Sequence, residues 1–165
     1  MEVATLIGVL KELAPELSTT GFVNIAPENK VSALRLGVCV DPTEYTIASA
    51  VNKGVNILVS YHPWHGEAKT LVLEKDIGII PLHTAWDNAP EGVNFTFAKE
   101  LGLTDIRIRE NIVVGATDML LRNLLERCQR LVDQNIIPYC GEPRTLVKQI
   151  GIWAGPGFLP FNKPV

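Results

Sequence analysis

The three histidines of this 165-residue chain stand in two short segments, each of which follows an apolar run. His62 and His65 lie in SYHPWHG, directly after VNILV, and His83 begins the stretch HTAWD, which ends at Asp87. Imidazole nitrogens and a carboxylate together suit Zn, Fe, Mn or Co. One bridging carboxylate can also hold two such ions and activate a water between them. These four residues are therefore candidate metal ligands; the alternative is that they are ordinary solvated loop residues.

The apolar runs before these segments have the pattern of strands buried on both faces. Amphipathic stretches that suit helices alternate with them. We predict strands at 33–40, 55–60 and 77–83, and helices at 2–13, 42–54, 69–78 and 91–102. This order predicts an α/β fold, with a mainly parallel (mixed) sheet that carries helices on both faces. The carboxyl ends of parallel strands share one edge of a sheet, so we expect His62 and His83 to meet there.

Asp41 also follows a predicted strand, but a different role explains it. Asp41 can cap the next helix, Pro42 fits the first helical position, and Glu44 can close a capping box. We therefore predict that Asp41 is a helix cap.

The second part of the chain continues with a less regular pattern. We predict a strand at 105–111, a helix at 117–133, and strands at 135–140 and 146–155. Two regions follow from this: 1–110, the α/β core that carries both histidine segments, and 111–165, which extends the same domain.

Composition excludes several classes of partner. The net charge is -3 and no cluster of Lys or Arg is present, which argues against a nucleic-acid polymer. No apolar run approaches the roughly 20 residues that a membrane-spanning helix needs. The three cysteines are widely spaced without a CxxC pair, and the N-terminus does not have the pattern of a signal peptide. A cytoplasmic protein is expected.

The segments ILVSYHPWHG and GIIPLHTAWDNAPEGVN, in this order, resemble the NIF-three-like family, also called the GTP cyclohydrolase I type 2 family. The resemblance implies a two-lobed α/β fold, a ring-like homo-hexamer and a dinuclear metal site. By position, His62 matches the second histidine of the family's His-His-Pro motif, and Asp87 matches the aspartate that bridges the ions. His83 matches the start of its His-Thr-x-x-Asp motif, close to the metals as a group that could relay protons.

Three departures from the family pattern reduce the expected ligand set. Tyr61 stands where the first histidine of His-His-Pro should be, and a phenol with an ordinary pKa of about 10 is a poor ligand at neutral pH. The family's Trp-Asp-Asn-x-Gly-Leu motif is absent. Its C-terminal Gly-His-x-x-x-Glu pattern does not occur before Val165. We therefore expect a shortened member that lacks the C-terminal part of the fold and binds one or two Zn, Fe or Mn ions, or none. His65 could supply the missing imidazole.

Aromatic side chains flank the candidate ligands. If the two segments face each other, Trp64 and Trp86, together with Tyr61, could stack on a planar small molecule such as a nucleobase. The alternative is that the two tryptophans cap the hydrophobic edge of the sheet.

Two functions remain open. In the first, a divalent ion on His62 and Asp87, assisted by His65, activates water for hydrolysis of a small, nucleotide-like substrate, with His83 as general acid or base. In the second, the protein is a degenerate, non-catalytic module that binds a metal or ligand and acts through assembly with itself or a partner.

Overall fold

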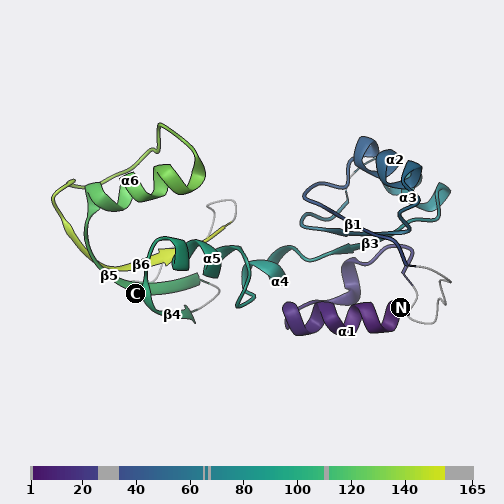
Figure 1. Ribbon diagram of the computed structural model, residues 1–165, viewed down its shortest axis with the longest axis horizontal. Helices are drawn as coiled ribbons and strands as arrows, with labels where there is room; N and C mark the ends of the chain where they lie inside the picture. Colours follow the sequence, from purple (N-terminus) through teal and green to yellow (C-terminus); the bar gives the residue numbers. More distant parts are fainter. Residues whose placement is uncertain (1, 26–33, 65, 67, 110–111, 155–165) are drawn as a thin grey trace. The chain divides into compact units, whose positions relative to one another are not determined.

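The computed structural model describes residues 2–25, 34–64, 66, 68–109 and 112–154 (Figure 1). The chain forms two compact units, residues 1–89 and 90–165. Each has a three-stranded sheet of its own. The predicted boundary at 110/111 falls inside the second unit, between two strands that pair with each other.

The first unit is a parallel sheet covered by helices on both faces. Its strands are β1 (Leu36–Cys39), β2 (Ile57–Ser60) and β3 (Gly78–Pro81), in the order β1-β2-β3. Its helices are α1 (Val3–Leu13), the 3-10 turn η1 (Thr19–Gly21), α2 (Glu44–Asn52), α3 (Ala68–Glu74) and α4 (His83–Asp87). Helix α1 covers one face, and α2 and α3 cover the other (Figure 1). The predicted α/β class is confirmed.

Alternation along the strands gives each face its own hydrophobic core. Ile57, Val59 and Ile80 pack with the apolar side of α1. Leu58 and Ile79 point the other way and pack with α2 and α3. Because β2 and β3 are buried on both faces, their sequences are continuous apolar runs.

The predicted cap of α2 is wrong. The N-cap residue is Thr43, whose backbone is extended and whose Oγ1 accepts a hydrogen bond from the backbone N–H of Thr46 at 3.2 Å. The helix begins at Glu44, so Asp41 lies too far upstream to reach its free N–H groups. The carboxylate of Asp41 contacts His62 instead.

We expect Thr43→Ala to lower the free energy of unfolding by about 1 kcal/mol, because it removes the side chain that caps α2. Asp41→Ala should leave the helix intact. Urea denaturation with far-ultraviolet circular dichroism compares the two variants. If Asp41→Ala lost the helix and Thr43→Ala did not, the cap would be Asp41 after all.

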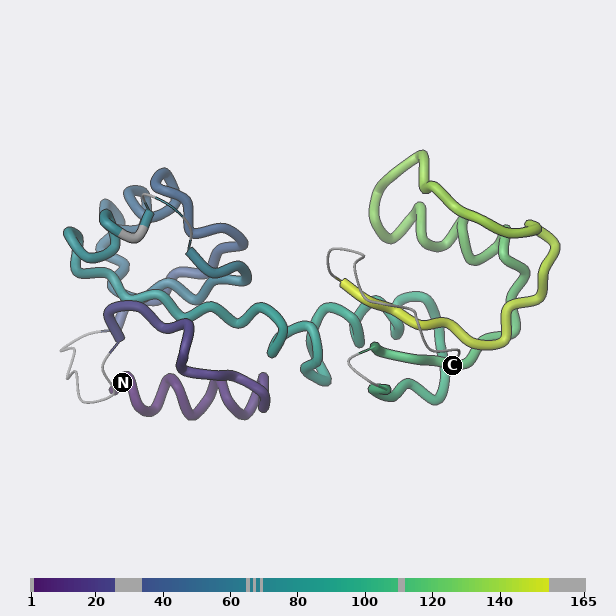
Figure 2. Tube along the Cα trace, turned by 180° about the vertical axis from the view of Figure 1, so that it is seen from behind, coloured from purple at the N-terminus to yellow at the C-terminus, as the bar shows by residue number. Residues whose placement is uncertain are grey.

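The second unit is an antiparallel sheet with two helices. It consists of α5 (Val93–Glu100), β4 (Thr104–Arg109), β5 (Ile112–Leu120), α6 (Leu121–Val132) and β6 (Leu146–Ile152), with strand order β4-β5-β6. Figure 2 follows the same path along the chain. The strand predicted at 105–111 is confirmed over its described residues as part of β4, and the strand predicted at 146–155 is confirmed as β6, which ends earlier, at Ile152.

Two predictions for the second unit are wrong. The helix predicted at 117–133 begins only at Leu121, because the four residues before it belong to β5, where Leu120 pairs with Leu146. Residues 135–140, predicted as a strand, are irregular. Pro138 has no backbone N–H, so it cannot donate to a sheet ladder.

Helix α6 is amphipathic but lies mostly at the surface. Leu124 and Cys128 pack against the core of the second unit, whereas Val132 is 42% exposed. Arg127 fixes the helix by donating from Nη1 to the carbonyl of Leu101 at 2.9 Å. Across the described residues, every helix is too short or too polar to cross a bilayer.

Candidate functional site

Backbone hydrogen bonds bring the two histidine segments together at the carboxyl edge of the parallel sheet. Beyond the end of β2, the N–H of Tyr61 donates to Cys39 at 3.0 Å and that of His62 donates to Val40 at 2.9 Å. Beyond β3, the N–H of His83 donates to the carbonyl of Tyr61 at 2.9 Å. The parallel ladder therefore continues past the strands and brings the two segments together, as expected for a parallel sheet.

Three rings form a cluster at this edge. The centroid of the Tyr61 ring lies 4.7 Å from that of His62 and 5.5 Å from that of His83, and the two imidazole centroids are 5.6 Å apart. His65, the fourth predicted ligand, lies outside the described residues.

Asp87 is held by Tyr61. Its side chain is 3% exposed, and its Oδ1 accepts a hydrogen bond from the Tyr61 hydroxyl at 2.6 Å. Burial, the hydrogen bond to Asp87 and the negative charge of that carboxylate together raise the pKa of Tyr61 to about 12. Tyr61 therefore remains a neutral donor at physiological pH rather than a phenolate ligand.

Asp41 is a site residue that the sequence analysis assigned to another role. Its Oδ1 lies 2.7 Å from Nδ1 of His62, with the two side chains 60% and 40% exposed. An ionised carboxylate can only accept, so Nδ1 is the donor and the neutral imidazole presents Nε2 as its lone-pair atom. The sequence signal for this contact is that Asp41 follows β1, which ends at the same edge of the sheet as β2 and β3.

His83 begins a helix rather than ending a strand. Strand β3 ends at Pro81, and α4 starts at His83, so the predicted strand is too long at its end. His83 has a φ of 30°, a conformation that is uncommon for residues other than glycine. Its Nδ1 is 3.0 Å from Oγ1 of Thr84. His83 and Asp87 are four residues apart in α4, and this spacing places both on one side of the helix.

The two tryptophans belong to different faces of the sheet. Trp64 packs against the core that contains α2 and α3, and Trp86 packs against the core that contains α1. This arrangement favours the alternative in which each tryptophan covers the hydrophobic edge of the sheet. It does not favour a pocket in which both tryptophans stack on one ligand.

The described residues offer two neighbouring imidazoles, which is fewer donors than the resemblance implies for two ions. Imidazoles that share a tetrahedral zinc at a Zn–N distance of about 2 Å have ring centroids about 5 Å apart. The 5.6 Å between His62 and His83 is close to this value. Within the part of the chain that the structure describes, no three His, Cys, Asp or Glu side chains gather as a ligand group. Asp87, the predicted bridging ligand, already accepts from Tyr61.

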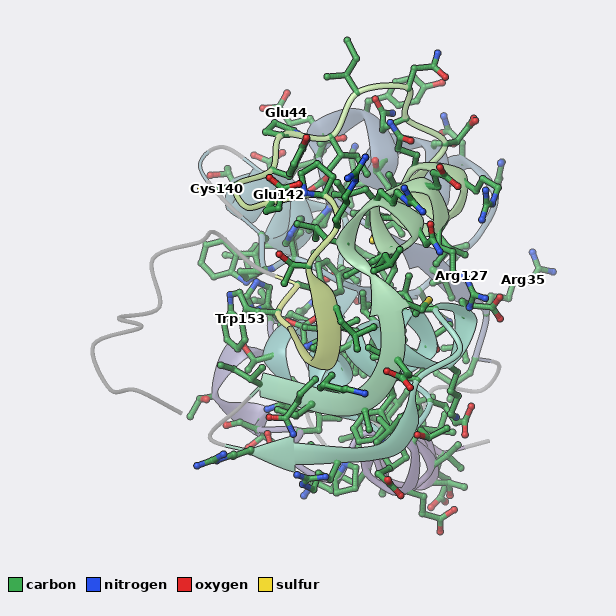
Figure 3. The ribbon with its side chains drawn as sticks, turned by 90° about the vertical axis from the view of Figure 1, so that its left-hand side faces the viewer. Arg35, Glu44, Arg127, Cys140, Glu142 and Trp153 are labelled. Carbon is green, nitrogen blue, oxygen red and sulfur yellow. The ribbon has the colours of Figure 1, made fainter. Side chains whose placement is uncertain are left out.

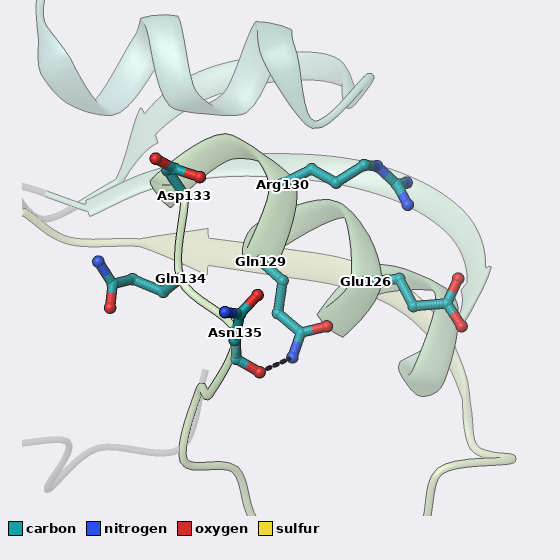
Figure 4. A pocket seen from close by; sticks show the side chains of 6 residues that line it. All are labelled: Glu126, Gln129, Arg130, Asp133, Gln134 and Asn135. Atoms are coloured by element: carbon teal, nitrogen blue, oxygen red, sulfur yellow. Dashed lines mark hydrogen bonds between the residues drawn. The ribbon is translucent and has the colours of Figure 1, made fainter.

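A hollow lies in the second unit, around the C-terminal end of α6 (Figure 4). Its volume is about 340 Å³, and its lining consists of Glu126, Gln129, Arg130, Asp133, Gln134 and Asn135. Gln129 donates from Nε2 to the carbonyl of Asn135 at 2.8 Å. The lining contains no imidazole or thiol, so the edge of the first unit that carries His62 and His83 remains the candidate site.

Similarity to solved structures agrees with the fold. A Staphylococcus aureus protein superposes with a TM-score of 0.75 at 20% identity, over 96% of this chain and 74% of that one. A Bacillus cereus protein related to NIF3 has a TM-score of 0.72 at 14% identity, over 93% of this chain and 76% of that one. Reduced HcgD from Methanocaldococcus jannaschii has a TM-score of 0.63 at 22% identity, over 79% of this chain and 60% of that one.

Sequence comparison points the same way. The chain is 25% identical to NIF3-like protein 1 of Drosophila melanogaster, over 94% of this chain and 64% of the relative. It is 27% identical to a GTP cyclohydrolase 1 type 2 homolog of Staphylococcus aureus, over 67% of this chain and 34% of that relative. The chain thus spans between about a third and two thirds of these relatives. The model of the Duf34/NIF3 (NGG1p interacting factor 3) family matches residues 1–162, and the chain belongs to this family.

Proposed function

We propose that this chain is a metal-binding member of the Duf34/NIF3 family that holds a single divalent ion at the histidine edge, with the Nε2 atoms of His62 and His83 as ligands. We define the histidine edge as Asp41, Tyr61, His62, His83 and Asp87. The observation that carries the proposal is the 2.6 Å hydrogen bond from Tyr61 to Asp87. It engages Oδ1 of the carboxylate that the resemblance assigns to bridging two ions, which leaves that carboxylate fewer free lone pairs for a metal.

The phenol changes the site in two ways. Tyr61 supplies no imidazole nitrogen where the resemblance expects one, which removes a ligand. Its hydroxyl also gives the carboxylate of Asp87 a hydrogen-bond partner. Asp87 is 3% exposed, and a buried charge is costly unless it is paired or hydrogen-bonded. Both effects disfavour a second ion and leave the two imidazoles as donors.

The surroundings of both imidazoles suit this role. His62 is oriented by Asp41 through Nδ1, and His83 is oriented by Thr84 through its own Nδ1. Metal-binding histidines commonly use one ring nitrogen for such a contact and the other for the ion. Zn, Fe or Mn is the ion expected from this donor chemistry.

A hydrolase is the second candidate function, favoured by the backbone of His83. Its φ of 30° is strained for a residue with a Cβ, and strained residues concentrate at functional sites. A bound divalent ion would lower the pKa of a water ligand. In this scheme His62 helps to hold the ion, while Nε2 of His83 exchanges a proton with a small substrate. The name of the staphylococcal relative supports a nucleotide such as GTP as the first substrate to test.

The metal content of purified variants tests the proposal. Wild-type protein loaded with Zn²⁺ or Mn²⁺ and desalted should carry about one ion per chain, and His62→Gln should lose it. Tyr61→His should raise the content towards two, because it adds a nitrogen donor and frees Asp87. Tyr45→His is the matched control, since Tyr45 is 84% exposed on α2, and it should leave the content unchanged. Inductively coupled plasma mass spectrometry measures all four.

Two ions on the wild type, or full retention of the ion in His62→Gln, would contradict the single-ion site. His83→Gln separates the two candidate functions when the same preparations are incubated with GTP. If His83→Gln loses the ion and the wild type does not turn over GTP, the result supports a binding protein. If the wild type turns over GTP, and His83→Gln keeps the ion but loses this activity, then His83 is the acid or base of a hydrolase.

A further inference from the structure

Ser60 is a buried polar residue directly beside the histidine edge. It is the last residue of β2 and the one polar residue in that strand, and it is 1% exposed. A buried hydroxyl is costly unless it is hydrogen-bonded. Its Oγ donates to the backbone carbonyl of His62 at 2.7 Å. The hydrogen-bond partner of Ser60 is therefore the backbone of a proposed metal ligand.

Four hydrogen bonds hold the backbone of Tyr61 and His62. Three of the four groups, the two N–H groups and the carbonyl of Tyr61, bond to backbone groups of other segments, which belong to Cys39, Val40 and His83. The fourth group is the carbonyl of His62, which accepts from Oγ of Ser60. This bond is the only one of the four that uses a side chain, so a substitution can remove it alone.

The imidazole of His62 is fixed by a different contact. Its Nδ1 lies 2.7 Å from Oδ1 of Asp41, and because a carboxylate can only accept, Nδ1 carries the proton and Nε2 is the unprotonated nitrogen. Asp41 follows β1 whereas His62 follows β2, so the contact depends on where the peptide of His62 is placed. The hydrogen bond from Ser60 fixes this peptide on its carbonyl side.

We propose that Ser60 is a positioning residue: its hydroxyl fixes the peptide of His62 so that the imidazole meets Asp41 and keeps Nε2 available for an ion. The inference rests on the proposed function, because it concerns His62 as a metal ligand. Ser60 itself contacts no ion in this scheme. The alternative is that the hydroxyl only satisfies its own hydrogen bond, and its loss would then change the stability of the protein but not the state of the imidazole.

The tautomer of His62 in metal-free protein tests the role of Ser60 without an ion. Proton–nitrogen correlation spectra of the imidazoles, recorded in alkaline buffer, distinguish the protonated from the unprotonated ring nitrogen. The wild type should show the Nδ1–H form of His62, and Ser60→Ala should shift it towards the Nε2–H form, which an imidazole without a partner at Nδ1 prefers. Ser60→Thr keeps a hydroxyl on the same carbon and should retain the wild-type form. Loss of signals in His62→Gln assigns them.

The affinity for Zn²⁺ tests the consequence for the metal site. Ser60→Ala should raise the dissociation constant at least about tenfold, the usual effect of losing a group that orients a ligand, and Ser60→Thr should restore it. Val72→Ala is the matched control: Val72 is 0% exposed in α3, so its truncation lowers stability but leaves every hydrogen bond of His62 in place. Every protein carries Cys140→Ser, because Cys140 is an exposed thiol of the second unit (Figure 3) that could bind Zn²⁺ itself.

The outcomes separate this inference from the proposed function. A wild type that binds no ion would overturn the single-ion site, and the tautomer of His62 would still decide the role of Ser60. Ser60→Ala with the wild-type tautomer or the wild-type affinity would overturn the inference and leave the metal site intact. A wild type in the Nε2–H form, or a change of tautomer in Val72→Ala equal to that in Ser60→Ala, would overturn it as well.

Discussion

We expect Ile79→Ala and Ile80→Ala each to lower the free energy of unfolding by about 2–5 kcal/mol, the usual range for an isoleucine truncated in a tight core. Both side chains are 0% exposed, and they point to opposite faces of the parallel sheet. Ile79 packs in the core with α2 and α3, and Ile80 packs in the core with α1. Each substitution therefore opens a cavity in a different layer.

The size of this effect matters because domains are stable by only about 5–15 kcal/mol. Strand β3 also leads directly into α4, so its loss would displace His83 and Asp87. Leu73→Ala is the control, because Leu73 is 56% exposed on α3 and its truncation should cost no more than about 0.5 kcal/mol. Urea denaturation followed by tryptophan fluorescence measures all three. Equal stabilities of Ile79→Ala and Leu73→Ala would mean that Ile79 is not in a packed core.

Much of the first unit could be predicted because its signals are local and periodic. The runs that became β2 and β3 are mostly apolar, as is typical of short strands buried on both faces. The second unit was harder. Strand β5 has three buried residues in its first half, among them Val113 at 0% exposed, and a half-exposed end, so it lacks one clear period. Its last residues also continue into α6 without a polar cap, since Leu120 is the N-cap residue.

The candidate site shows a different limit of sequence analysis. That segments 61–64 and 83–87 lie at one edge follows from the order of parallel strands. Which side chains bond to each other does not follow. Asp41 has the residue type and position of a helix cap. In the structure Thr43 caps the helix instead, and the carboxylate of Asp41 contacts His62. The hydrogen bond from Tyr61 to Asp87 spans 26 residues and has no local signal.

The energy of the Tyr61–Asp87 hydrogen bond can be measured with a double-mutant cycle. Tyr61→Phe should lower the free energy of unfolding by about 1.5–3 kcal/mol, because the buried carboxylate loses the one side-chain donor that the described residues give it. Tyr61→Phe/Asp87→Ala should cost less than the sum of the single variants, because the carboxylate and the lost hydroxyl are removed together. We expect a coupling energy near 1.5 kcal/mol, the lower end for a hydrogen bond to a charged group, since Tyr61 is partly exposed.

The pair His62–Asp41 is the internal comparison for this cycle. Its atoms are as close, at 2.7 Å, but its side chains are 40% and 60% exposed, so its coupling energy should stay below about 1 kcal/mol. Equal coupling in the two pairs would mean that burial does not strengthen the bond to Asp87. A coupling near zero for Tyr61 and Asp87 in metal-free protein would remove the reason to expect a single ion. The carboxylate would then be free to bridge two ions, and the replacement of an imidazole by the phenol would no longer limit the site.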